Sequence, residues 1–277
     1  MSIDFQVKAG AFEHIKLKKL NRALGASGVL GLFELWAYTA QHAPDGKLPD
    51  SDQDIETAAN WDGAQGALAR ALRDIRLIDE TNGEFAVHGW QEHNQFLATG
   101  NGKRDRPVID FRLSASFASH PKIKKLLAQL GPEGVVGWLR LLATTCADYP
   151  DGTLRGFYIE DIASAGNWQG NGLLFVRTLC DLHLLDPDPR SQLLSELCVD
   201  DDVYIPDDDV PLHPFAIHNW IKQQPYRAGF SERSARSKRA NEAKRQKAAS
   251  AAALAAFASS APSPASTYEQ GSTPPLP

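Results

Sequence analysis

The chain has 277 residues, 43% of them hydrophobic, which is enough to bury one large core or two ordinary ones. No apolar run approaches the ~18 residues of a membrane span, and the first residues lack the apolar stretch of a secretory signal, so we expect a cytoplasmic protein without membrane contact. The three cysteines lack CxxC spacing, so we expect neither a zinc site nor a disulfide.

The net charge of −5 is unevenly distributed along the chain. From Lys222 onward, nine Lys or Arg and three Glu give +6, so residues 1–221 carry −11. An acidic body repels a polyanion unless its basic groups gather on one face. The C-terminal segment is therefore the more obvious basic element.

An internal repeat organises the chain. A shift of 106 positions places residues 3–48 on 109–154 with 21 identities in 46 positions, and a shift of 107 matches "DIETAANWDG" with "DIASAGNWQG". The end of the unit, "HGW", recurs as "HNW" after an insertion in the second copy. The repeat predicts a domain at 1–97, a linker at 98–106, and a second domain at 107–226 with an acidic wing insertion at 187–211.

Both copies have the same predicted order of elements. A short extended segment leads to a helix whose apolar stripe, in the second copy, has helical spacing and ends at Gly131. A longer apolar helix then stops at "PDG", and a short helix, an Asn-Trp turn, a third helix and a β-hairpin follow. We therefore predict a mainly α protein with small β-hairpins (α+β), built from two tandem winged helix-turn-helix domains.

The first helix of each copy carries a repeated lysine cluster. Its apolar stripe occupies the core-facing positions, so the lysines point away from the core, where a point charge suits phosphate neutralisation. An ordinary solvated helix face is the alternative. The predicted phosphate contacts are Lys16, Lys18, Lys19, Lys122, Lys124 and Lys125.

The helix after the Asn-Trp turn is the predicted recognition helix. In the first copy we expect Ala69 and the polar residues Gln65, Arg70 and Arg73 to face solvent, and arginine and glutamine suit base edges because both make bidentate contacts. In the second copy Arg177 occupies the position of Arg70, but the other two polar residues are replaced. Pairing of these arginines with an aspartate four residues later is the alternative.

Other repeated residues indicate packing and hydrogen bonding, not catalysis. The paired tryptophans indicate core packing, with base stacking as the alternative, and the paired histidines lack the spacing of metal ligands. The chain contains no phosphate loop, HExxH or GxSxG motif. The acidic triplets at 200–202 and 207–209 lack the spacing of a calcium loop, so we read them as a solvated wing. We expect no enzymatic activity, no cofactor and no small-molecule substrate.

The C-terminal segment has helix-forming composition but few large apolar residues. Residues 227–258 predict a basic, Ala-rich helix that orders on a polyanion, or alternatively a soluble spacer. Residues 259–277 are rich in Ser, Pro, Thr and Ala, which predicts disorder. The predicted DNA contacts here are Arg233, Arg236, Lys238 and Arg239.

The pattern "HPKIKKLLAQLGPEGVVGWLRLLATTCADYPDGTL", followed by "DIASAGNW", resembles the N-terminal winged-helix domain of phage replisome organisers and DnaD-like primosomal proteins. The "HxW" ending and the segment "ERSARSKRANEAKR" look like phage replication proteins as well. The resemblance covers about residues 105–245, and more weakly 3–97. It implies binding of an origin or of single-stranded DNA, and recruitment of a replicative helicase or its loader, although no helicase-contacting C-terminal domain is evident.

We therefore predict a DNA-binding protein of phage or prophage type that acts in DNA replication initiation in the host cytoplasm. Two alternatives stay open. One is a winged-helix transcriptional regulator, and the other is a module that binds protein instead of DNA, which a body of charge −11 permits.

Overall fold

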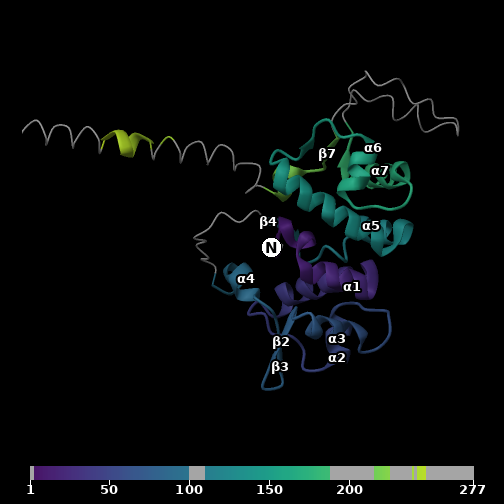
Figure 1. The fold of residues 1–277 in the computed structure, drawn as a ribbon, viewed down its shortest axis with the longest axis vertical. Coiled ribbons are helices and arrows are strands. Elements are labelled where there is room, and N and C mark those ends of the chain that lie inside the picture. Colours follow the sequence, from purple (N-terminus) through teal and green to yellow (C-terminus); the bar gives the residue numbers. More distant parts are fainter. Residues whose placement is uncertain (1–2, 100–109, 188–214, 225–238, 240–241, 248–277) are drawn as a thin grey trace, which may run out of the picture. The chain divides into compact units, whose positions relative to one another are not determined.

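A computed structural model of the chain describes residues 3–99, 110–187, 215–224, 239 and 242–247, with the side chains of 95–99 left out. The described part is mainly helical with small antiparallel sheets, as predicted (Figure 1). Both repeat copies belong to one compact unit, Met1–Gly229, and Phe230–Pro277 form a second. The two copies are therefore packed against each other and are not separate domains joined only by a linker.

The first copy begins with a strand and ends with a helix. The α4 helix continues to Thr99, two residues into the predicted linker at 98–106, and the rest of that linker lies outside the described residues. The elements in chain order are β1 (Asp4–Lys8), the 3-10 helix η1 (Ala9–Glu13), α1 (Ile15–His42), α2 (Asp52–Ala58), α3 (Ala67–Asp74), β2 (Ile78–Thr81), β3 (Glu84–Val87) and α4 (Trp90–Thr99).

The second copy repeats this order. Its last strand, β7, lies between β5 and β6 in an antiparallel sheet. The sequence "VYIP" at 203–206, which reads as the first strand of the predicted β-hairpin of this copy, lies outside the described residues. The elements are β4 (Asp110–Ser114), α5 (Pro121–Asp148), β5 (Thr153–Leu154), α6 (Ile159–Ala165), α7 (Gly172–Asp181), β6 (Leu185–Asp186), β7 (Phe215–Ile217) and α9 (Trp220–Gln223).

The long helices α1 and α5 each contain one sharp break. Gly25 and Gly131 have φ of 65° and 67°, a left-handed conformation that glycine adopts without the steric cost of a Cβ atom. Pro132, which cannot donate a backbone hydrogen bond, then starts the second segment of α5. The predicted end of the first helix at Gly131 is confirmed, and α1 and α5 each consist of a short lysine-bearing segment followed by a long buried one.

The first strands of the two copies pair with each other. β1 and β4 are antiparallel, with Phe5 opposite Leu113, Gln6 opposite Arg112, and Val7 opposite Phe111. The sequence predicted an extended segment here but not its partner. This strand pair ties the beginning of one copy to the beginning of the other.

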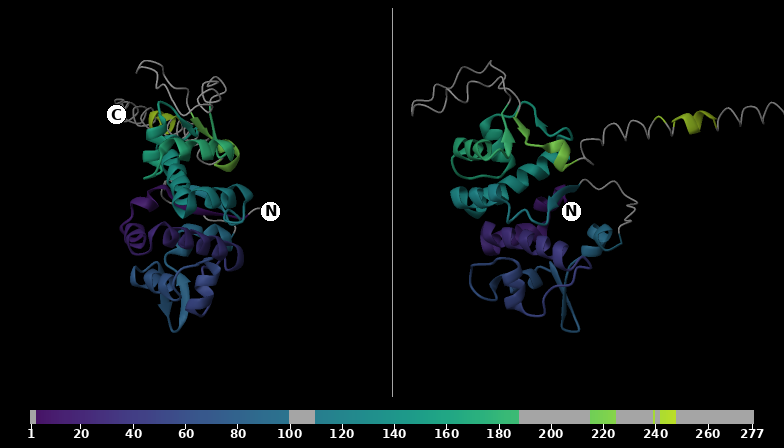
Figure 2. Two further views of the ribbon diagram at one scale, coloured as in Figure 1. Left: turned by 90° about the vertical axis from the view of Figure 1, so that its right-hand side faces the viewer. Right: turned by 180° about the vertical axis from the view of Figure 1, so that it is seen from behind.

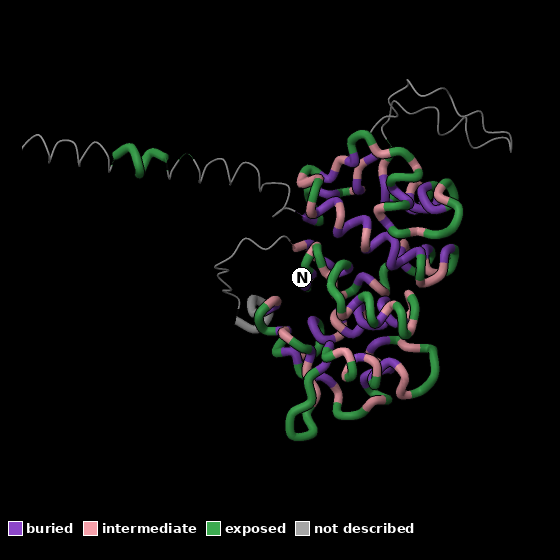
Figure 3. The backbone as a smooth tube through the Cα atoms, in the orientation of Figure 1, coloured by how far each residue is buried: buried purple, intermediate pink, exposed green. Residues whose placement is uncertain are grey.

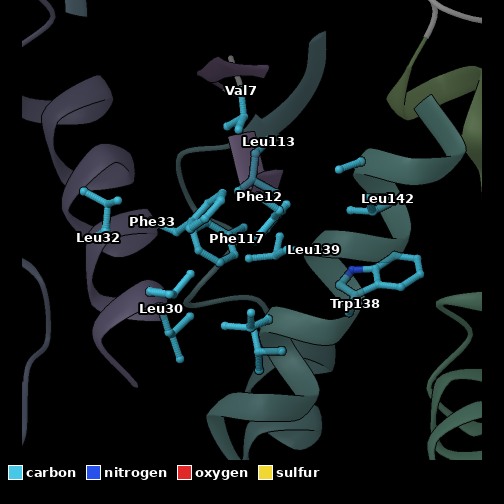
Figure 4. Close-up of a cluster of buried hydrophobic side chains, with 14 of the residues drawn as sticks. Val7, Phe12, Leu30, Leu32, Phe33, Leu113, Phe117, Trp138, Leu139 and Leu142 are labelled. Carbon is cyan, nitrogen blue, oxygen red and sulfur yellow. The ribbon is translucent and has the colours of Figure 1, made fainter. Parts of the chain in front are cut away.

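The long helices of the two copies, α1 and α5, lie side by side (Figures 1 and 2). Figure 4 shows Phe12, Phe33, Phe117 and Leu139 between the two helices. The rings of Phe12 and Phe33 stack with centroids 5.5 Å apart. In Figure 3 buried residues run along both helices, so one continuous apolar core serves both copies.

One equivalent position in these helices holds an acidic residue in the first copy and a basic residue in the second. Glu34 of α1 corresponds to Arg140 of α5, whose guanidinium lies 5.1 Å from the centre of the Phe12 ring. Burial raises the pKa of Glu34 to about 7, although a hydrogen bond with Asn60 opposes the shift. A carboxyl group that is protonated near neutral pH makes the stability of this core depend on pH.

We expect Glu34→Gln to flatten the pH dependence of stability between about pH 5 and pH 7.5. Because the folded-state pKa of about 7 lies above the ordinary value of 4.5, the proton stabilises the fold fully below about 4.5, and that contribution is lost as the pH rises to about 7. Partial burial limits the loss to about 1–2 kcal/mol. Urea unfolding of both proteins across this range measures it.

Glu92→Gln is the matched control, because this glutamate is exposed on α4. It should follow the wild-type profile. Parallel profiles for the wild type and Glu34→Gln would show that Glu34 does not hold a proton in the folded chain.

Candidate nucleic-acid interface

The α2–α3 pair of the first copy is held by a buried carboxylate. Glu56, on α2, is 5% exposed and accepts hydrogen bonds from the backbone N–H groups of Gly66, Leu68 and Ala69 at 2.7, 2.8 and 3.3 Å. A carboxylate at a helix N-terminus satisfies N–H groups that have no partner within the helix and interacts favourably with the helix dipole. Glu56 therefore determines where α3 begins and holds its N-terminus against α2.

The second copy caps the equivalent helix differently. Asn171 is the N-cap of α7, and its side chain accepts from the Leu174 N–H at 3.0 Å. The position of Glu56 is occupied by Ala163, which is buried. The reasoning from sequence missed Glu56; the available signal was that the first copy has Ala64 where the second has the capping residue Asn171.

The Asn-Trp turns have the same geometry in both copies. Asn60 and Asn167 have φ of 49° and 51°, so each reverses the chain in the left-handed region. The indole N–H of Trp61 donates to the Ala64 carbonyl at 3.1 Å, and that of Trp168 donates to the Asn171 carbonyl at 3.0 Å. These half-buried rings thus hold the loop that leads into α3 or α7, which agrees with the packing role expected for them.

The predicted base-reading residues differ in their surroundings. Gln65 and Arg70 are exposed, but Gln65 lies in the turn before α3 and not on the helix as predicted, because α3 begins only at Ala67. Arg177 is exposed as well, and its Nε lies 4.0 Å from Asp181. An exposed pair at this distance contributes little energy and leaves the guanidinium available to a ligand. Ala69, which was expected to face solvent, is buried because Glu56 draws the start of α3 onto α2.

Arg73 is engaged within the protein. Its guanidinium donates two hydrogen bonds to the carboxylate of Asp52, on α2, one of them at 2.8 Å, and lies 5.5 Å from the centre of the Phe85 ring. The hydrogen bonds to Asp52 raise the pKa of Arg73 and lower that of Asp52. A bidentate contact of this kind competes with a base for the guanidinium. Arg70 is consequently the more accessible arginine of α3.

The first lysine of each cluster binds a backbone carbonyl. The Lys16 Nζ donates to the Arg76 carbonyl at 2.5 Å, and the Lys122 Nζ donates to the His183 carbonyl at 2.6 Å. Both acceptors follow the end of α3 or α7 and have left-handed φ values of 58° and 48°. In each copy the lysine therefore ties the beginning of the first helix to the end of the α3 or α7 helix.

The histidine that precedes each cluster is a helix cap. The Nδ1 atoms of His14 and His120 accept hydrogen bonds from the backbone N–H groups of Lys16 and Lys122, each at 3.3 Å. The repeated "HxK" motif therefore starts the helix and places the first lysine. This local function accounts for its recurrence without any ligand.

The remaining lysines of the clusters are exposed. Lys18 forms an ion pair with Glu13 at 2.5 Å in which both side chains are more than half exposed. Within the described part of the chain, the side chains of the other three form no hydrogen bond or ion pair. These available cations are Lys19, Lys124 and Lys125.

The β2–β3 hairpin is acidic. Glu80 and Glu84 are exposed, Asp79 accepts from His88 at 2.9 Å, and the tip of the hairpin is exposed (Figure 3). Carboxylates at this position repel phosphate groups. The hairpin is therefore an unfavourable place for the first copy to contact DNA.

Few of the predicted C-terminal contacts fall within the described residues. Arg239 is helical and exposed, as are residues 242–247, which fits a basic helix over part of 227–258. Arg233, Arg236 and Lys238 lie outside the described residues, as do 188–211 of the acidic insertion and 259–277.

In the described ranges, no group of three or more His, Cys, Asp or Glu is placed to hold a metal ion, and no helix is long and apolar enough to cross a membrane. No family model, no curated protein and no solved structure matches the chain.

Proposed function

We propose that each copy is a winged helix-turn-helix domain and that the protein binds duplex DNA through α3 and α7. The observation that carries the proposal is the placement of Arg70 and Arg177. Both are exposed, and they occupy equivalent positions on α3 and α7, the second helices of the α2–α3 and α6–α7 pairs. In both copies an antiparallel strand pairing follows that helix. This order of elements is the one that places a recognition helix in the major groove.

The chemistry of the exposed side chains supports this function. An arginine can bind the O6 and N7 atoms of guanine in a bidentate manner, and Gln65 can do the same with adenine. Lys19, Lys124 and Lys125 can neutralise phosphates, which adds affinity without reading sequence. No part of this proposal requires catalysis or a cofactor.

A role in phage-type replication initiation rests on the resemblance of residues 105–245 to replisome organisers. The partner there would be a replicative helicase or its loader. We propose this role as the biological setting of the DNA binding.

DNA binding is tested by fluorescence anisotropy of the full chain on a mixed-sequence duplex. We expect affinity to fall steeply between about 50 and 200 mM salt, as counterion release requires. Arg70→Ala should weaken binding about tenfold, because it removes a base contact of about 1–3 kcal/mol. Arg177→Ala should weaken it by a similar or smaller factor.

Lys222→Ala is the matched control, since it removes an exposed cation from α9, outside both helix pairs. It should leave the affinity within about twofold. An affinity that does not respond to salt, or a Lys222→Ala effect equal to that of Arg70→Ala, would refute the proposal.

Binding of a protein partner is the second candidate, and one observation favours it. Tyr158, Leu173 and Leu174 are 45%, 38% and 50% exposed at the beginning of α6 and α7. Apolar side chains that remain in water around a helix start suit a protein surface better than a phosphate backbone. A chain that shows no salt-dependent DNA binding would favour this candidate.

A further inference from the structure

The pairing of β1 with β4 has an internal two-fold symmetry. Gln6 lies opposite Arg112, and these two residues occupy equivalent positions in the repeat. Phe5 and Phe111 are likewise equivalent, and so are their strand partners, Leu113 opposite Phe5 and Val7 opposite Phe111. The copies therefore meet as the two subunits of a symmetric dimer would, through identical surfaces.

The side chains that hydrogen-bond to the outer edges of the β1–β4 pair follow the same symmetry. The backbone N–H of Gln6 donates to the Asn94 Oδ1 at 2.9 Å, and that of Arg112 donates to the Gln224 Oε1 at 2.9 Å. Asn94 and Gln224 each lie four residues after the Trp of the "HxW" ending, and both are 3% exposed. The symmetry thus extends from the strands to the end of each copy.

The same symmetry carries over to α3 and α7. Lys16 fixes the end of α3 to the start of α1, and Lys122 fixes the end of α7 to the start of α5 in the same way. Since α1 packs on α5 in a shared core, the operation that exchanges β1 and β4 also exchanges α3 and α7. The two helices are therefore related by the same two-fold axis, and they point in opposite directions along a ligand that lies across this axis.

From this arrangement, and resting on the proposed function, we infer that the DNA target is a duplex with two half-sites in inverted orientation, bound by a single chain. Two-fold related recognition helices require two-fold related half-sites, at a separation that the protein sets. The duplication places both recognition helices in one chain, whereas a homodimer has one in each of its two chains.

The half-sites must also differ in sequence. Both helices carry an arginine at the same position, Arg70 or Arg177, but the second copy has Gly172 in place of Gln65 and so lacks an adenine-reading amide at that position. Fusing the copies removes the requirement that both read the same bases. The expected site is an imperfect inverted repeat with one half specified more strongly than the other.

Selection of bound duplexes from a random library by the full chain gives the site, and titration gives the stoichiometry. We expect one chain per duplex. Reversing one half-site, or adding about five base pairs between the halves, should weaken binding about 10- to 100-fold, because only one helix can then engage its half. Arg70→Ala should relax the preference in one half-site and Arg177→Ala in the other.

The outcomes separate this inference from the proposed function. If no duplex is bound in a salt-dependent manner, both fail. If DNA is bound but reversal and spacing have no effect, or both substitutions relax the same half-site, or two chains occupy one site, the inference fails while the proposed function stands.

Discussion

Gly152→Ala is expected to lower the free energy of unfolding by about 3 kcal/mol or more. Gly152 has φ of 79°, and a Cβ atom there would lie 2.2 Å from Cγ and 2.6 Å from Cβ of Trp220. Trp220 is 3% exposed, and its indole N–H donates to the Pro150 carbonyl at 2.9 Å. The ring and its backbone would have to move away, and with them the adjoining strand β7, which pairs with β5 and β6.

Gly156→Ala is the matched control for this effect. Gly156 has nearly the same φ, 74°, but no atom lies within 4 Å of its would-be Cβ. Its substitution should therefore cost about 1 kcal/mol, the penalty of a left-handed residue with a side chain. Urea unfolding of both variants separates the steric cost from the backbone cost, and equal losses would contradict the close approach of Trp220.

The repeat explains why so much of each copy was predictable from sequence. The break at Gly131, the stop at "PDG" and the short helix before the Asn-Trp turn depend on local backbone preferences, and the structure has all three. The fold class follows from these elements. The predicted winged helix-turn-helix assignment rests on the same local signals, whereas the predicted domain boundaries rest on the repeat.

What the sequence did not reveal depends on contacts between distant residues. The pairing of β1 with β4 joins segments more than a hundred residues apart, and an alternating apolar pattern carries no information about its partner. In the same way, a helical stripe placed Arg73 towards solvent, but Asp52 and Phe85 of other elements enclose it. All lysines of the two clusters were predicted to contact phosphates, although Lys16 and Lys122 are bound to backbone carbonyls.

Glu56→Ala is expected to lower the free energy of unfolding by about 3 kcal/mol, because it leaves buried N–H groups of α3 without an acceptor. The carboxylate serves three backbone donors, and two of them belong to the buried residues Leu68 and Ala69. Glu56→Gln keeps one carbonyl oxygen but turns an amide N–H₂ towards those donors, so we expect an intermediate loss of about 1–2 kcal/mol. Denaturant unfolding with a constant m-value measures both changes.

Asn171→Ala supplies the comparison, since it removes the cap of the equivalent helix in the second copy. That cap is a neutral amide that accepts one bond near the surface, so its loss should cost about 1 kcal/mol. The ratio of the two effects tests whether charge and burial make the Glu56 cap the stronger one. A Glu56→Ala loss no larger than that of Asn171→Ala would mean that water reaches the start of α3 and that α2 does not determine how this helix is held.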